Sequence, residues 1–403
     1  MRFIPSKIFI NFISCYSIWL YSIPIIFSLI SACVFLLLGI SRITRKNVDK
    51  DSQLEDDVFP LIQILIPVTG VTDKSREILE TLLVQDYPNY RVTFVVENES
   101  DPVFNLVKEF CAEYKHVAFI VSGAASKSGQ KNFGLVKAVS ALAADVEILV
   151  FCDSTNVARA DWLKKISRPV RYGRFEVCTT FRSFVPETIN VPGVCQAIYA
   201  TTVFALLTVM PKPWGGATVI RKSAFDRLDV SKVWSNTVVD DLTLGNILNK
   251  ANVKIYVSRE NFLWSPIKKQ TFKRLFAFLD RQILFPKFTN PGIWAFTVFW
   301  HISLCVSLVM SSIGLISCLF GVSMPEFPII GGVFWIGILT LLTRLKSVNQ
   351  EKIPITKWLA AFPVLVFVAT FICVRSIFLD YIDWYGKRYY CSYGGKVSEI
   401  REV

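Results

Sequence analysis

The chain has 403 residues, of which 52% are apolar, and the apolar residues gather in long runs rather than spreading evenly. The formal net charge of +12 comes from lysines and arginines beside those runs, which favours a membrane surface and argues against nucleic-acid binding. Ten cysteines without regular spacing exclude a disulfide framework, and only two histidines leave acid–base and metal chemistry to carboxylates.

The first apolar run covers residues 17–40 and contains no charge. As a helix it is long enough to cross a hydrocarbon core of about 30 Å. It is too long for the apolar part of a signal peptide, and it leads directly into Arg42, Arg45 and Lys46 without a cleavage site. We therefore expect residues 1–45 to be an uncleaved transmembrane anchor.

Residues 54–290 have the pattern of an α/β domain. Buried strands are predicted at 61–67, 90–96, 118–121 and 146–152, and helices at 75–85 and 132–144. Such alternation predicts a Rossmann-like, mostly parallel sheet covered on both faces, with ligands at the carboxyl ends of its strands. Asp101 and Asp153 follow two of these strands.

Two segments of this domain have a membrane character. Residues 193–210 carry no charge, but a single crossing there would separate Asp153 from Asp240 and Asp241. We expect a helix that lies on or dips into the bilayer, with a helix buried inside the domain as the alternative. Residues 267–285 mix basic and aromatic side chains, which predicts an interfacial helix; an ordinary surface helix is the alternative.

Three further spans are predicted at residues 288–325, 327–343 and 358–374. Residues 291–380 would thus hold about three transmembrane helices, and residues 381–403 a basic, aromatic tail. We expect a multi-pass integral membrane protein whose catalytic domain faces the cytosol. Three crossings would put the tail outside, whereas its basic residues favour the inside, so one segment could be re-entrant.

Carboxylates stand where such a domain binds ligands. Asp101 and Asp153 follow strands, and Asp240 and Asp241 form an adjacent pair. Taken singly, each could be only a helix cap or a turn residue. As an ordered set with their neighbours they are far less ambiguous.

The set resembles the family-2-type glycosyltransferases with a GT-A fold, most closely the ceramide glucosyltransferase branch. The resembling residues are Ile66-Pro67, Gln85-Asp86-Tyr87-Pro88, Glu99-Ser100-Asp101-Pro102, Gly129-Gln130-Lys131-Asn132, Cys152-Asp153-Ser154, Pro213-Trp214-Gly215-Gly216-Ala217 and Asp240-Asp241-Leu242. The resemblance spans nearly the whole chain. It implies a GT-A domain and a nucleotide-sugar donor.

The resemblance also implies roles for single residues. Asp101, with Glu99, would contact the uracil or ribose side of the donor. Asp153 would belong to a DxD-like site for the diphosphate and Mg²⁺ or Mn²⁺, with Lys131 near the phosphates.

On the acceptor side, the resemblance makes Asp241 the general base. Asp240 would raise the pKa of Asp241 through its like charge. Trp214, Gly215 and Gly216 resemble the acceptor-side loop, in which glycines allow close backbone approach.

The chain departs from the family pattern at two places. Ser154-Thr155-Asn156 follows Asp153, so the second acid of a DxD is absent, and a metal would be shared with Asn156 or with the donor. The (Q/R)xxRW motif survives only as Phe278-Leu279-Asp280-Arg281-Gln282. Arg281 could still stabilise the leaving diphosphate. In polymer synthases the lost tryptophan stacks on the growing chain, so its absence favours single transfer.

The expected activity is inverting transfer of one sugar, most simply glucose from UDP-glucose, to a hydroxyl of a membrane lipid such as ceramide, giving a β-glycoside. Alternative acceptors are diacylglycerol, a hopanoid or a polyprenyl phosphate. A polysaccharide synthase and an inactive membrane scaffold remain as further alternatives.

Overall fold

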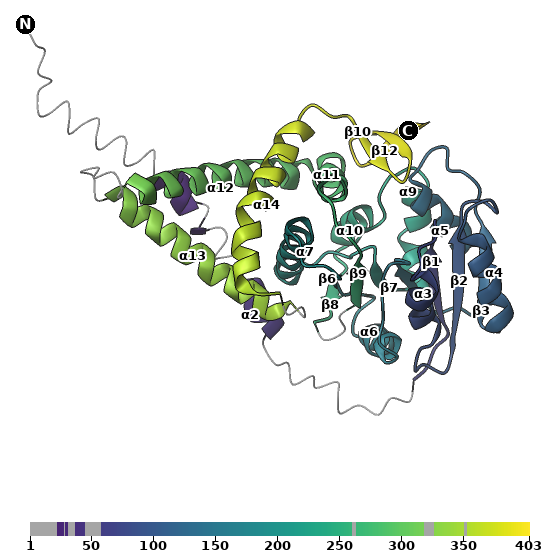
Figure 1. The fold of residues 1–403 in the computed structure, drawn as a ribbon. Helices are drawn as coiled ribbons and strands as arrows, with labels where there is room; N and C mark the ends of the chain where they lie inside the picture. The colour runs from purple at the N-terminus through teal and green to yellow at the C-terminus, as the bar shows by residue number, and fades with distance from the viewer. Residues whose placement is uncertain are drawn as a thin grey trace, which may run out of the picture.

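The computed structural model describes residues 22–27, 29–30, 37–44, 58–259, 263–317, 326–349 and 353–403. An α/β domain lies on one side of a group of apolar helices (Figure 1). Half of the apolar run expected to span the membrane, residues 17–40, lies outside the described residues. Its described part ends in α2 (Leu38–Thr44).

In the described part of the chain, seven strands form one sheet in the order β3-β2-β1-β4-β7-β5-β8. The four strands at one side are parallel, and β7 runs antiparallel between β4 and β5. The strands are β1 (Ile62–Pro67), β2 (Tyr90–Val96), β3 (Val117–Val121), β4 (Ile148–Cys152), β5 (Val177–Thr179), β7 (Ala217–Arg221) and β8 (Ile255–Val257). The predicted α/β class with a mostly parallel sheet is confirmed.

Helices cover both faces of this sheet, because successive side chains of a strand point to opposite faces. Ile64 of β1 packs in a core with α3 (Ser75–Leu83), α4 (Phe104–Glu113) and α6 (Trp162–Arg171). Leu65, the next residue, packs on the other side. The helices of that side are α5 (Gln130–Ser140), α8 (Lys222–Arg227), α9 (Val230–Trp234) and α10 (Asp241–Lys250).

The apolar helices form a second core beside the domain. They are α7 (Val191–Val209), α11 (Phe272–Thr289), α12 (Pro291–Ser317), α13 (Glu326–Val348) and α14 (Ile355–Ser376). Among the described residues, α7, α12, α13 and α14 are long and apolar enough to cross a membrane.

The helix predicted at residues 267–285 begins later than expected. Ile267 ends β9 (Leu263–Ile267), which pairs in parallel with β6 (Arg182–Pro186). The helix α11 starts at Phe272 because the Thr271 side chain accepts a hydrogen bond from the backbone N–H of Arg274, as an N-cap does. The expected boundary is thus wrong by five residues.

The chain ends in an antiparallel sheet of β10 (Tyr381–Trp384), β11 (Lys387–Ser392) and β12 (Lys396–Glu402). This C-terminal sheet docks on the α/β domain. The backbone N–H of Val238 donates to Gly395 O (2.9 Å), and that of Val397 donates to Asn236 O (3.0 Å). The chain therefore returns to the domain after its apolar helices (Figure 1).

Candidate active site

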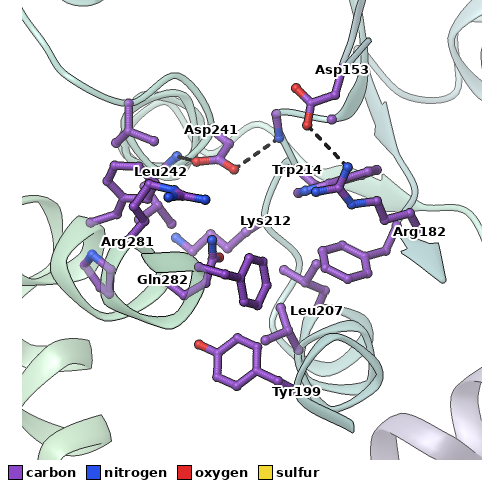
Figure 2. A pocket seen from close by; sticks show the side chains of 18 of the residues that line it. Asp153, Arg182, Tyr199, Leu207, Lys212, Trp214, Asp241, Leu242, Arg281 and Gln282 are labelled. Atoms are coloured by element: carbon purple, nitrogen blue, oxygen red, sulfur yellow. Dashed lines mark hydrogen bonds and ion pairs between the residues drawn. The ribbon is translucent and has the colours of Figure 1, made fainter. Parts of the chain in front are cut away.

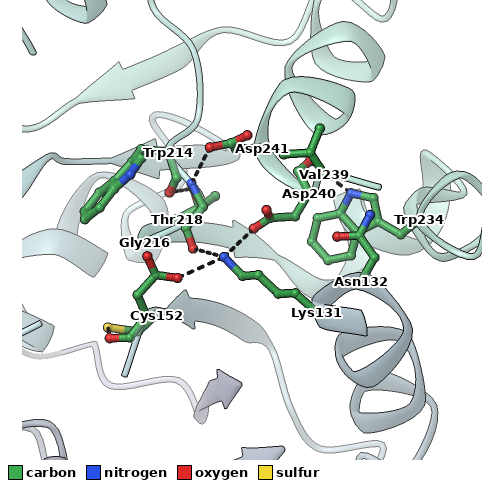
Figure 3. Close-up of polar contacts among 12 residues, drawn as sticks. Lys131, Asn132, Cys152, Trp214, Gly216, Thr218, Trp234, Val239, Asp240 and Asp241 are labelled. Atoms are coloured by element: carbon green, nitrogen blue, oxygen red, sulfur yellow. Dashed lines mark hydrogen bonds and ion pairs between the residues drawn. The ribbon is translucent and has the colours of Figure 1, made fainter. Parts of the chain in front are cut away.

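Acidic residues from two elements meet at one lysine beyond the carboxyl end of β4. Asp153 directly follows β4, Lys131 lies in the first turn of α5, and Asp240 precedes α10. The Lys131 Nζ lies 2.9 Å from Asp153 Oδ1 and 2.9 Å from Asp240 Oδ2, and it donates to Gly215 O at 2.9 Å (Figure 3). Lys131 thus joins segments that lie far apart in the sequence.

The lysine is needed because Asp240 is buried. Only 4% of Asp240 is exposed, and a buried carboxylate requires a compensating charge. Burial itself would lower the pKa of Lys131, but attraction to Asp153 and Asp240 outweighs it and holds that pKa above its ordinary value. Lys131 therefore stays protonated.

Asp241 is fixed at the first position of α10. Its Oδ2 accepts a hydrogen bond from the Gly215 N–H (3.1 Å), and its Oδ1 accepts one from the Leu242 N–H (2.7 Å). Burial, followed by the negative charge of Asp240, raises the pKa of Asp241 to about 7. A carboxyl group with such a pKa is suited to act as a general base near neutral pH.

The Trp214–Gly216 turn packs against the carboxylates of Asp240 and Asp241. A side chain on Gly215 would overlap the Asp240 carboxylate, and one on Gly216 would overlap the Trp214 ring. The Trp214 N–H donates to Thr179 Oγ1 (3.0 Å), which fixes the turn to the sheet. Glycine is therefore required where the backbone approaches Asp240 and Asp241.

Arg182, in the first position of β6, was not predicted as a site residue. Its Nη1 lies 3.9 Å from Asp153 Oδ2 and donates to Thr155 Oγ1 (2.8 Å). Its guanidinium also lies over the Trp214 ring, 5.3 Å from the ring centre. Arg182 and Arg281 reach into the cavity from opposite sides (Figure 2).

A cavity of about 900 Å³ runs from these polar groups into the apolar helices. Its polar end is lined by Glu97, Lys131, Asp153, Arg182, Trp214, Gly215, Gly216, Asp240, Asp241 and Arg281. Its apolar end is lined by Ile198, Leu206, Phe296, Leu304, Leu341, Leu342, Leu365 and Val366. One cavity thus connects ionisable side chains with apolar side chains of α7, α12, α13 and α14.

Three residues expected in the donor site, Glu99, Asp101 and Asn156, do not line the cavity. Glu99 is exposed, and neither it nor Asp101 lines the cavity. The Asp101 carboxylate accepts hydrogen bonds from Thr69 Oγ1 (2.6 Å) and the Gly70 N–H (2.8 Å). Because Thr69 does line the cavity, Asp101 positions a residue of the cavity wall. Glu97, which directly follows β2, lines the cavity itself.

Asn156 lies behind the site. It is completely buried, and its Nδ2 donates to Gly216 O (2.7 Å). Its Oδ1 accepts from Ser265 Oγ (3.2 Å) and Arg182 Nη1 (3.4 Å). These bonds occupy the Asn156 amide with protein partners, and the expectation that Asn156 shares a metal with Asp153 stays a prediction.

The metal-binding capacity of this site rests on Asp153. Among the described residues, no group of three or more His, Cys, Asp or Glu side chains could enclose a metal ion. Mg²⁺, however, commonly binds one or two carboxylates together with substrate phosphates. Lys131 takes one oxygen of Asp153, and the other has Arg182 only at 3.9 Å. Asp153 therefore fits a metal site that is completed by the phosphates of a bound ligand.

The C-terminal sheet also reaches the cavity. Trp384, Tyr385, Lys387 and Tyr389 line it, although they follow the last apolar helix. In the sequence, these residues are marked by the dense aromatic and basic side chains of Trp384-Tyr-Gly-Lys-Arg-Tyr-Tyr, which could have indicated a functional segment. Nothing comparable marks Arg182.

Comparison with protein families gives a match to the family described as Glycosyl transferase family 21, over residues 24–397. Comparison with curated proteins gives no match. Among solved structures, the mannosyltransferase PcManGT from Pyrobaculum calidifontis in complex with GDP-Man and Mn²⁺ shares 12% identity at a TM-score of 0.48, covering 90% of this chain and 99% of that one.

A 4-diphosphocytidyl-2C-methyl-D-erythritol synthase from Anaerococcus prevotii also shares 12% identity, at a TM-score of 0.36. That alignment covers 54% of this chain and 93% of that one. At TM-scores below 0.5, neither likeness bears on the chemistry of this chain.

Proposed function

Because this chain belongs to glycosyl transferase family 21, we propose that it transfers a single glucose from UDP-glucose to a hydroxyl of a membrane lipid such as ceramide. The observation that carries the proposal is the cavity. Its polar end offers a base and several cations, and its apolar end lies among helices that are apolar enough to cross a membrane. A lipid acceptor matches both ends, with its hydroxyl at Asp241 and its chains among the helices.

The reaction is a direct displacement. Asp241 accepts the proton of the acceptor hydroxyl, whose oxygen attacks the anomeric carbon of the sugar. The bond from that carbon to the diphosphate breaks, so UDP leaves and the product is a β-glycoside. Asp241 is oriented for this step by the Gly215 and Leu242 N–H groups.

The leaving diphosphate gains negative charge, and the cavity offers cations to balance it. Arg182, Arg281 and Lys131 line its polar end. Asp153 would hold Mg²⁺ or Mn²⁺ together with the donor phosphates, and the metal would supply further positive charge at the diphosphate. Glu97, and Asp101 through Thr69, shape the nucleoside end of the site.

We further propose that the α/β domain faces the cytosol. Basic residues lie where the apolar helices meet the α/β domain, since Lys268 pairs with Asp73 and the Arg42 carbonyl accepts a hydrogen bond from Arg259. Such residues favour the cytosolic face of a membrane. Nucleotide sugars would then reach the site from the cytosol and the acceptor from the bilayer.

The test is release of UDP from UDP-glucose by the full-length protein in lipid nanodiscs, with and without acceptor lipid. We expect UDP release with ceramide and loss of turnover in Asp241→Asn, by about 10²–10⁴-fold, because the general base is removed. Donor binding should remain, since the substitution changes little in shape. Diacylglycerol, a hopanoid and a polyprenyl phosphate are the parallel acceptors.

Retained turnover in Asp241→Asn would eliminate this residue as the base. Turnover with an alternative lipid but not with ceramide would replace the acceptor and leave the mechanism in place. Asp145→Asn is the matched control, because Asp145 forms an exposed ion pair with Arg91. Its activity should equal that of the wild type.

A further inference from the structure

The turn between β10 and β11 holds a residue in an unfavourable conformation. Tyr385 and Gly386 connect the two strands with φ values of 49° and 75°. Two-residue hairpin turns with two positive φ values favour Asn-Gly or Gly-Gly, and a bulky residue at the first position is strained. The strain indicates that this position is held by a requirement other than turn formation.

Tyr385 stands at the mouth of the cavity. It is 73% exposed and at the same time lines the cavity. Its side chain lies near both Arg182 and Arg281, because a negative charge on Tyr385 would raise the pKa of either guanidinium. Among the described residues its hydroxyl has no hydrogen-bond partner, so this donor is available to a ligand.

Neighbouring residues fix the turn in that place. The Lys387 Nζ lies 2.5 Å from Glu97 Oε1, and the Lys387 side chain is only 9% exposed. The Trp384 ring packs edge-on against Phe285 of α11 at 5.4 Å. The turn is therefore anchored before Tyr385 by the contact of Trp384 with α11, and after it by the ion pair of Lys387 with Glu97, the residue that follows β2.

We propose that the Tyr385 hydroxyl donates a hydrogen bond to the diphosphate of the nucleotide sugar between Arg182 and Arg281. This inference rests on the proposed function, since it places the donor in the polar end of the cavity. Two guanidinium groups create a place for an anion, and a phenol beside them adds a directional donor that they lack. The C-terminal sheet would thus complete the donor site after the chain has passed through the membrane helices.

The test compares UDP with uridine, which lacks the phosphates, by calorimetric titration of the full-length protein in nanodiscs. In Tyr385→Phe we expect UDP to bind about tenfold more weakly, as for loss of one hydrogen bond to a charged group, and uridine to bind as before. Tyr385→Asn, which suits the turn, should show the same loss with an unchanged or higher thermal unfolding midpoint.

Tyr393→Phe is the matched control, because Tyr393 is 78% exposed and does not line the cavity. UDP affinity in this variant should equal that of the wild type. Equal UDP affinity of the wild type and Tyr385→Phe would overturn this inference alone. An equal loss for UDP and uridine would overturn it as well, by moving the contact to the nucleoside. Wild-type protein that does not discriminate UDP from uridine would overturn the proposed donor and this inference together.

Discussion

The pKa of Asp241 depends on its burial and on the charges of the neighbouring Asp240 and Lys131. Lys131 forms ion pairs with Asp240 and Asp153, which compensates the buried carboxylate of Asp240. Burial raises the pKa of Asp241 most, and the negative charge of Asp240 raises it further. The positive charge of Lys131 on α5 acts in the opposite sense and lowers the pKa of Asp241.

This arrangement predicts how activity depends on pH. Asp241 can accept a proton only when it is ionised, so kcat/KM should be constant above a pH of about 7 and fall tenfold per pH unit below it. In Asp240→Asn one cause of the raised pKa is absent, so the acidic limb should move to lower pH. The measurement is kcat/KM for the acceptor at saturating donor between pH 5 and 9.

The Asp145→Asn variant again serves as the control, and its acidic limb should coincide with that of the wild type. If the acidic limb of the kcat/KM profile of Asp240→Asn stays in place or moves to higher pH, the electrostatic link between the two aspartates is contradicted. A pH-independent rate in the wild type would show that proton transfer to Asp241 does not limit kcat/KM.

At the level of elements, the sequence predicted the parts of the sheet whose pattern is simple. The strand predicted at 61–67 corresponds to β1, and that at 146–152 to β4, because fully buried parallel strands are near-continuous apolar runs. The helices predicted at 75–85 and 132–144 match α3 and α5 in place, though not in length. Asp153 could be placed at the carboxyl edge for the same reason.

Other elements had no such pattern. The strands β10 and β12 mix apolar with charged residues, since they are held by docking rather than by a continuous apolar face. Arg182 enters the site only because β6 pairs with β9, some 80 residues away in sequence. Such long-range pairing, like the ion pair of Lys387 with Glu97, leaves no local signal.

The C-terminal sheet offers a test at this scale. Lys387→Met leaves the carboxylate of Glu97 without its cation, and breaking such a largely buried pair costs about 3 kcal/mol. We expect the sheet to undock more often, because the same residue also contacts Gln130 of α5. Limited proteolysis should then cut within residues 381–403 faster than in the wild type.

Lys396→Met is the comparison, since Lys396 is exposed, and its cleavage rate should remain that of the wild type. The double variant Lys387→Met/Glu97→Gln should recover part of the lost protection, because no uncompensated charge remains. Equal protection of Lys387→Met and the wild type would mean that the backbone contacts at Val238 and Asn236 hold the sheet by themselves.

For the whole molecule, the path of α7 argues against a membrane crossing by this helix. At its start, Asn190 Nδ2 donates to Gln270 O (2.8 Å) in the segment before α11. Beyond its end, the Trp214 N–H donates to Thr179 Oγ1 on the central sheet. Both ends therefore lie against the α/β domain, as expected for a helix that lies along the membrane surface.

The last three helices also begin and end on the same side. Near the start of α12, Trp294 Nε1 donates to Ser376 Oγ (2.9 Å) at the end of α14. Lys287 of α11 donates to Ser376 O at 2.7 Å. Since α14 packs along α7, with Cys195 Sγ donating to Ala361 O, α12 and α13 are the two of these three helices left to cross. Two crossings return the chain to the domain, whereas three would not.

This path predicts the accessibility of tags in sealed vesicles. A tag after Val403 and a tag inserted at Asn252 should be exposed on the same face, because the C-terminal sheet docks on the α/β domain. A tag inserted before Glu326, at the start of α13, should be exposed on the opposite face, since α12 is long enough to cross. Each tag is read by protease protection in vesicles of both orientations, with turnover as the control for folding. Tags at Val403 and Asn252 on opposite faces would contradict the docked sheet, and a tag at Glu326 on their own face would make α12 and α13 a re-entrant hairpin.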